Sequence, residues 1–116
     1  MQIKVYTSHN VLEINTLFID KCINNSINEW RYKQFSIGEN AIFKTIEKGG
    51  NTIIIAFLIE EIDEGFTLSP AQIKGERILS FSEVTSFITE IIGLLVNKMW
   101  DSIDHITIVK NNIKQQ

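Results

Sequence analysis

The chain has 116 residues and a mass of 13.3 kDa, which is the size of a single domain with one hydrophobic core. Hydrophobic residues make up 44% of the sequence and charged residues 22%, and these values exclude a disordered or fibrous chain. Acidic residues outnumber basic ones by 14 to 11, so the formal charge is −3. A general nucleic-acid binder is disfavoured, because such proteins need a basic face.

The sequence indicates a cytoplasmic protein that binds no membrane. Cys22 is the sole cysteine, so no disulfide can form within the chain. The N-terminal residues lack the basic start and the long apolar region of a signal peptide. The longest apolar stretch, residues 84–96, is interrupted by polar side chains and is too short to span a bilayer.

The first elements are a strand and a helix. Residues 3–7 alternate apolar and polar side chains, as a short strand does. Ser8 or Asn10 is a candidate N-cap for a helix over residues 11–23. Apolar side chains recur there every three or four positions and form one stripe, at Val11, Leu12, Ile14, Leu17, Phe18, Ile19, Cys22 and Ile23.

Residues 27–37 predict a second strand with two different faces. One face carries Trp30, Tyr32 and Gln34, and the other carries Arg31, Lys33 and Phe35. Such aromatic residues on a polar strand either fill the edge of the core or, when exposed, anchor an interface. The sequence leaves both readings open, and we take Trp30 and Tyr32 as candidate partner-binding residues.

A hairpin follows. Gly49 and Gly50 separate residues 41–48 from residues 51–62, and two adjacent glycines favour a tight turn with positive φ. The run 52–59 is almost wholly apolar, which predicts a central strand buried on both faces. Residues 41–48 also fit helical spacing, so a helix there is the alternative.

The next segment contains the densest group of charges. Residues 60–65 form an acidic turn with Glu60, Glu61, Asp63 and Glu64. Residues 66–68 predict a brief strand that Ser69 and Pro70 end, and residues 77–81 predict an edge strand.

The best-defined element begins at Ser80, which together with Glu83 fits a capping box. The apolar face of this helix comprises Val84, Phe87, Ile88, Ile91, Ile92, Leu95 and Met99, and we expect Trp100 to cover the core. The helix should end at Asp101 and Ser102. Residues 103–109 predict the last strand with His105 pointing outward, and residues 111–116 predict a disordered polar tail.

These elements predict an α+β fold built as a two-layer sandwich. A mainly antiparallel sheet would carry two amphipathic helices on one face, in the order β-α-β-β-β-α-β over a single domain of residues 1–116.

No motif in the sequence predicts an enzyme, a metal site or a cofactor site. A nucleophilic set of Cys22, His105 and Asp104 can be drawn, but Cys22 lies on an apolar helical stripe, where a cysteine is usually inert. His9 and His105 are more typical of surface histidines. A small hydrolase using His105 with Asp101 or Asp104 is therefore the weakest functional hypothesis.

The acidic turn has two interpretations. Its spacing does not match a calcium loop, so it is either a solvated turn or a surface that receives a basic protein. We take Glu60, Glu61, Asp63 and Glu64 as candidate partner-binding residues, since they agree with the negative net charge.

The leading hypothesis is a small acidic inhibitor that neutralises a cationic partner, such as a nuclease toxin, by blocking its active site. Bacterial immunity proteins and antitoxins are of this type, and the comparison rests on size and charge alone. The alternative is a secretion-chaperone-like or homodimeric assembly module, which would expose a large apolar patch.

Overall fold

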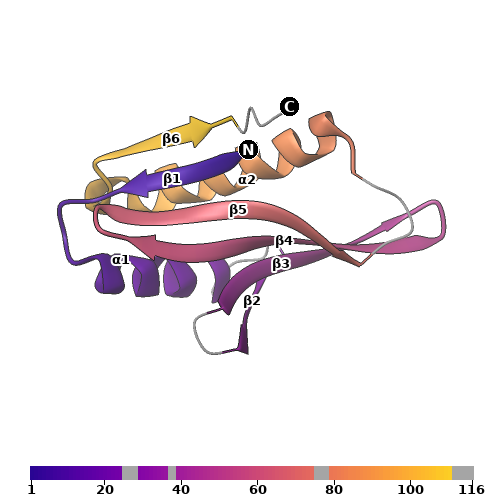
Figure 1. The fold of residues 1–116 in the computed structure, drawn as a ribbon, viewed down its shortest axis with the longest axis horizontal. Helices are drawn as coiled ribbons and strands as arrows, with labels where there is room; N and C mark the ends of the chain where they lie inside the picture. Colours follow the sequence, from indigo (N-terminus) through magenta and orange to yellow (C-terminus); the bar gives the residue numbers. More distant parts are fainter. Residues whose placement is uncertain (25–28, 37–38, 75–78, 111–116) are drawn as a thin grey trace, which may run out of the picture.

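Six strands of the described chain form one antiparallel sheet in the order β2-β3-β4-β5-β1-β6 (Figure 1). The structure is a computed structural model that describes residues 1–24, 29–36, 39–74 and 79–110. The strands are β1 (Gln2–Tyr6), β2 (Arg31–Ser36), β3 (Glu39–Lys48), β4 (Asn51–Ile62), β5 (Gly65–Lys74) and β6 (His105–Val109). The helical segments are α1 (Val11–Leu17), η1 (Phe18–Asn24), α2 (Phe81–Met99) and η2 (Trp100–Ser102).

The helices pack on one face of the sheet, which confirms the predicted two-layer α+β sandwich. Ile14 of α1 and Phe18 of η1 join Ile88 and Leu95 of α2 in one buried cluster with the inward side chains of the sheet. The rings of Phe18 and Phe66 meet with their centroids 5.5 Å apart. In the view of Figure 1, β1 and β5 lie in front of α2.

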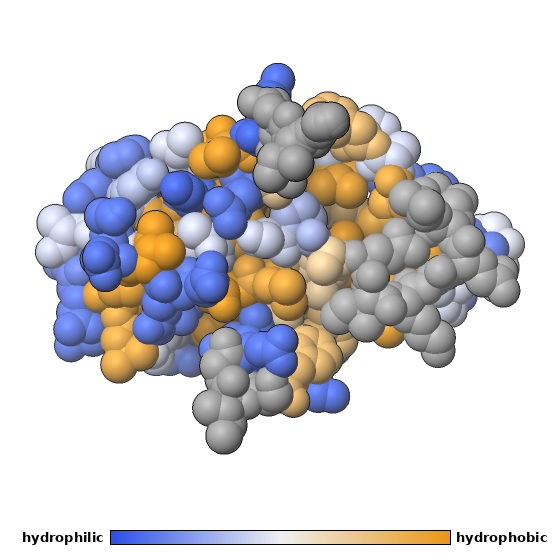
Figure 2. Space-filling model, in the orientation of Figure 1, coloured by the Kyte–Doolittle hydropathy of each residue, from blue (hydrophilic) through white to orange (hydrophobic). Residues whose placement is uncertain are grey.

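The other face of the sheet is uncovered in the described chain. Figure 2 shows hydrophobic side chains mixed with hydrophilic ones there. The expectation that residues 52–59 are buried on both faces is therefore wrong at Leu58, which is half exposed, while Phe57 and Ile59 point into the core. The central position of this strand, between β3 and β5, is confirmed.

Two local predictions are confirmed by backbone geometry. Gly49 and Gly50 have φ of 60° and 82° and form the turn between β3 and β4, so this segment is a hairpin and not a helix. The Ser80 side chain accepts from the Glu83 amide at 3.2 Å, and the Glu83 side chain accepts from the Ser80 amide at 2.9 Å, which is the predicted capping box.

The segment after the acidic turn differs from the prediction. β5 continues through Ser69 and Pro70, where the prediction ended the strand. Four described strands, β2 to β5, lie between η1 and α2, against three in the predicted order. Pro70 lies beyond residues 65–68, with which β1 pairs, so no strand of the described chain pairs with it on that side, and a proline is tolerated there. The predicted edge strand over residues 77–81 is wrong at Phe81, which begins α2, and residues 77–78 lie outside the described chain, as does the tail 111–116.

Two glycines predict opposite effects of the same substitution. A Cβ at Gly65 would lie 1.7 Å from the Val5 carbonyl oxygen, whereas a Cβ at Gly93 of α2 meets nothing within 4 Å. Gly65→Ala should lower the free energy of unfolding by about 1–3 kcal/mol through overpacking. Gly93→Ala should raise it by about 0.5–1 kcal/mol through helix propensity. Urea denaturation of both variants measures the two effects, and equal changes would contradict this reading of the strand contact.

Candidate functional site

Thr7 joins two turns that are far apart in the sequence. Its amide donates to the Glu64 carbonyl at 2.8 Å, and its hydroxyl donates to the Ser102 carbonyl at 2.8 Å. The Ser8 hydroxyl then donates to the carboxylate of Asp104 at 3.3 Å. The turn between β4 and β5 and the segment between α2 and β6 therefore lie side by side, at the end of the molecule shown on the left of Figure 1.

This end gathers more acidic residues than the sequence indicated. The predicted group Glu60, Glu61, Asp63 and Glu64 is exposed throughout, and we call it the acidic hairpin. Asp101 and Asp104, which are also exposed, are brought to the same end by the Thr7 contacts. This proximity could not be predicted from the sequence, because the two segments are far apart in the chain and no local pattern connects them.

The structure also divides the acidic hairpin between two faces. Successive strand residues point to opposite sides of a sheet. Glu60 therefore follows Leu58 onto the uncovered face, whereas Glu61 follows Ile59 toward the helices. There Glu61 accepts a hydrogen bond from the Asn15 side-chain amide of α1 at 3.2 Å. Asp63 and Glu64 occupy the turn itself.

Glu61 and Tyr32, two of the predicted binding residues, line one groove of about 320 Å³ between α1 and the sheet. Tyr32 is opposite Ile42 in the pairing of β2 with β3, which directs it to the helical side. Its hydroxyl donates to the Asn40 side chain at 3.0 Å, and 38% of the residue is exposed. We call this the α1 groove, and its lining also includes Leu12, Asn15, Thr16, Ile19, Asp20 and Gln34.

Two features of the α1 groove are unusual for a solvated surface. Leu12 is 63% exposed although it lies on the apolar stripe of the predicted helix. The Oδ1 atom of Asn15 is buried without a hydrogen-bond partner among the described residues. A buried carbonyl oxygen without a partner costs free energy.

Trp30 does not contribute to this surface. It is 1% exposed and packs edge-on against Phe57 and Phe87. Its indole N–H donates to Glu90 at 2.7 Å, and the same carboxylate pairs with Lys44 at 3.0 Å. Of the two readings that the sequence left open, Trp30 fills the core and Tyr32 lies at the surface.

The structure does not bring Cys22 together with His105 and Asp104 as a nucleophilic set. Cys22 is buried against α2, where its thiol lies 3.6 Å from the Leu94 carbonyl oxygen. Burial raises the pKa of the Cys22 thiol to about 11, and nearby Lys98 and Lys21 offset only part of that effect. His105 is exposed and stacks on Tyr6 with 4.2 Å between ring centroids.

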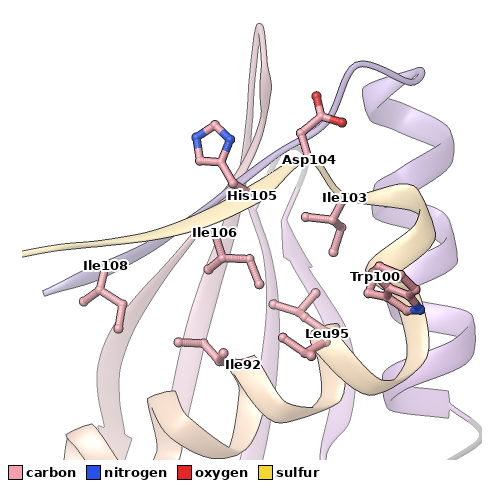
Figure 3. A pocket seen from close by; sticks show the side chains of 9 residues that line it. Ile92, Leu95, Trp100, Ile103, Asp104, His105, Ile106 and Ile108 are labelled. Atoms are coloured by element: carbon pink, nitrogen blue, oxygen red, sulfur yellow. The ribbon is translucent and has the colours of Figure 1, made fainter.

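A second groove, of about 390 Å³, lies between α2 and β6 (Figure 3), and sequence reasoning missed it. Ile92 and Leu95 of α2 face Ile106 and Ile108 of β6, whereas the His105 ring and the Asp104 carboxylate lie on the other side of the strand (Figure 3). We call it the β6 groove. Trp100 lies at its end and is 70% exposed, so the expectation that it covers the core is wrong. Val96 and Trp100 are four positions apart, so they share one side of the helix, and this spacing could have indicated an apolar surface there.

Among the described residues, His, Cys, Asp and Glu side chains nowhere form a group of three that would hold a metal ion. Neither helix in the described part of the chain combines the length and the apolar composition that crossing a bilayer requires. The chain matches no protein-family model, no curated protein and no solved structure at a significant level.

The raised pKa of Cys22 makes a stability prediction. The unfolded thiol ionises near pH 9.0 and the folded one near pH 11, so the folded state binds the proton more tightly. This contribution to stability is complete below pH 9 and is lost as the pH rises to about 11. The difference in unfolding free energy between the wild type and Cys22→Ala should therefore shrink over this window, by on the order of 2 kcal/mol. Denaturant titrations at several pH values measure it, and a constant difference would show that the folded thiol is not desolvated.

Proposed function

We propose that this chain is a small protein-binding inhibitor that receives a basic protein partner on the acidic hairpin and the adjoining α1 groove. The observation that carries the proposal is the placement of Glu61 and Tyr32 in one groove beside an exposed Leu12. The partner would be a cationic enzyme, such as a nuclease, whose active site the chain blocks.

The charge distribution supports a basic partner. The net charge is −3, and exposed carboxylates from the acidic hairpin and from Asp101 and Asp104 share one end of the molecule. A surface potential of one sign accelerates encounter with a partner of the opposite sign. Carboxylates also occupy the same positive sites as phosphates do, so they suit competition with a nucleic-acid substrate.

The composition of the α1 groove supports a protein partner. Protein interfaces combine exposed aromatic or apolar anchors with a polar rim. Tyr32 and Leu12 would supply the anchors, and Glu61 and Asp20 would supply charge at the rim. The hydrogen bond from Asn15 already orients Glu61, which reduces the entropy lost when an arginine or lysine of the partner pairs with it.

Charge reversal at Glu61 tests the proposal. Purified basic nucleases are the probe, and the measurements are inhibition of nucleic-acid cleavage and association rates at low and physiological salt. Glu61→Lys should slow association about tenfold at low salt, and the effect should shrink as salt is added. Glu47→Lys is the matched control, because Glu47 is exposed near the Gly49–Gly50 turn at the opposite end of the sheet.

Two outcomes would contradict the proposal. The first is that none of the basic nucleases is bound or inhibited by the wild-type chain. The second is that Glu61→Lys and Glu47→Lys change the association rate equally, because the effect would then come from net charge and not from the α1 groove.

A further inference from the structure

The two edges of the sheet differ in how they are protected. An edge strand exposes unpaired backbone groups that can pair with another strand, and charged side chains are a common defence. β2, at one edge, carries Arg31 and Lys33. β6, at the other edge, has the sequence HITIV with no Lys, Arg, Asp or Glu, and its neighbour in the described sheet is β1. Among the described residues, the β6 edge is therefore open to strand addition.

The sequence around β6 is complementary to itself in one orientation. In an antiparallel pair centred on Thr107, Ile106 lies opposite Ile108, and the acidic Asp104 just before β6 comes to the same end of the pair as the basic Lys110 just after β6 of the other copy. Each of these pairs occurs twice by symmetry. A parallel pair in register would instead place Asp104 against Asp104 and Lys110 against Lys110, which is unfavourable.

We propose that two copies of this chain form a symmetric dimer through antiparallel pairing of their β6 strands. The contact is isologous, so one self-complementary patch serves both copies and the assembly closes at two. The two sheets continue into each other across the β6 strands. This assembly does not require the inhibitor proposal, and Asp104 is the one residue that both use.

The apolar surface beside β6 fits a second copy. Ile106 and Ile108 pair with Val5 and Ile3, so their side chains lie on the core side of the sheet, in the β6 groove. Ile108, Val96 and Trp100 are each about half exposed or more in the single chain. Pairing of β6 with β6 brings the groove-side isoleucines of the second copy against this surface and removes it from water.

The dimer leaves the α1 groove accessible. β6 and β2 are the opposite edges of the sheet, and Tyr32 of the α1 groove lies on β2. Because the β6 strands are antiparallel, the two acidic hairpins lie at opposite ends of the dimer. A variant that breaks the dimer can therefore be tested apart from one that weakens binding of a basic partner.

Thr107→Glu tests the pairing. Thr107 is exposed and lies opposite Lys4 of β1, so a glutamate there is compatible with the fold of the single chain. In the dimer, the two new carboxylates lie opposite each other at the symmetry axis and repel. Light scattering after gel filtration should give twice 13.3 kDa for the wild type. The dimer Kd should rise at least about tenfold in the variant. Thr45→Glu, on an exposed position of β3, is the matched control and should remain dimeric.

A charge swap tests the register. Asp104→Lys should weaken the dimer, because it places two lysines at each end of the pair, and Asp104→Lys combined with Lys110→Asp should restore it. A wild type that is monomeric at about 0.1 mM would overturn the proposal, since a dimer of micromolar Kd is almost fully formed there. Equal effects of Thr107→Glu and Thr45→Glu would overturn it as well, and so would a double variant that shows no recovery. Glu61→Lys should leave the mass unchanged.

Discussion

The packing of α1, η1 and α2 on one face of the sheet determines what the rest of the molecule exposes. The inward side chains of β1, β4 and β5 are buried beneath these helices, with Phe57, Phe66 and Leu68 fully enclosed. The opposite face keeps apolar side chains such as Leu58 half exposed. A groove remains beside each edge strand, between α1 and β2 on one side of the sheet and between α2 and β6 on the other.

The alternation of side chains along the strands then determines which residues lie in the α1 groove. One position separates Glu60 from Glu61, yet Glu60 points to the uncovered face and Glu61 into the α1 groove beside Asn15. Two positions separate Trp30 from Tyr32, and both face the helices, but Trp30 lies where α2 covers the sheet and Tyr32 lies where that cover ends. Position along the chain, as well as the face of the sheet, therefore separates a core residue from a surface residue.

The parts of the fold that the sequence predicted correctly depend on local chemistry. The reciprocal bonds of Ser80 and Glu83 and the positive φ angles of Gly49 and Gly50 involve neighbours in the chain, so their residue types were sufficient. Trp100 was wrongly predicted to cover the core, because its exposure depends on where α2 ends relative to β6, which is a long-range property. The extension of β5 through Pro70 was missed for a similar reason, since it depends on how far the pairing of β1 with β5 extends. For the candidate site, the residue types of the acidic hairpin were informative, but its partition between two faces and its proximity to Asp104 required the Thr7 contacts.

The order of the strands keeps the two proposed contacts at opposite edges of the sheet. β1 lies between β5 and β6, so β6 is the edge of the described sheet that is farthest from β2. A contact at β6 involves backbone groups and isoleucines, whereas a contact at the α1 groove involves Tyr32, Leu12 and carboxylates. The first kind of contact depends on strand pairing and apolar burial, which salt screens weakly, and the second depends on exposed charges, which salt screens strongly. Because antiparallel pairing directs the two acidic ends away from each other, like charges are separated in the dimer, and self-association adds little electrostatic repulsion to a chain of net charge −3.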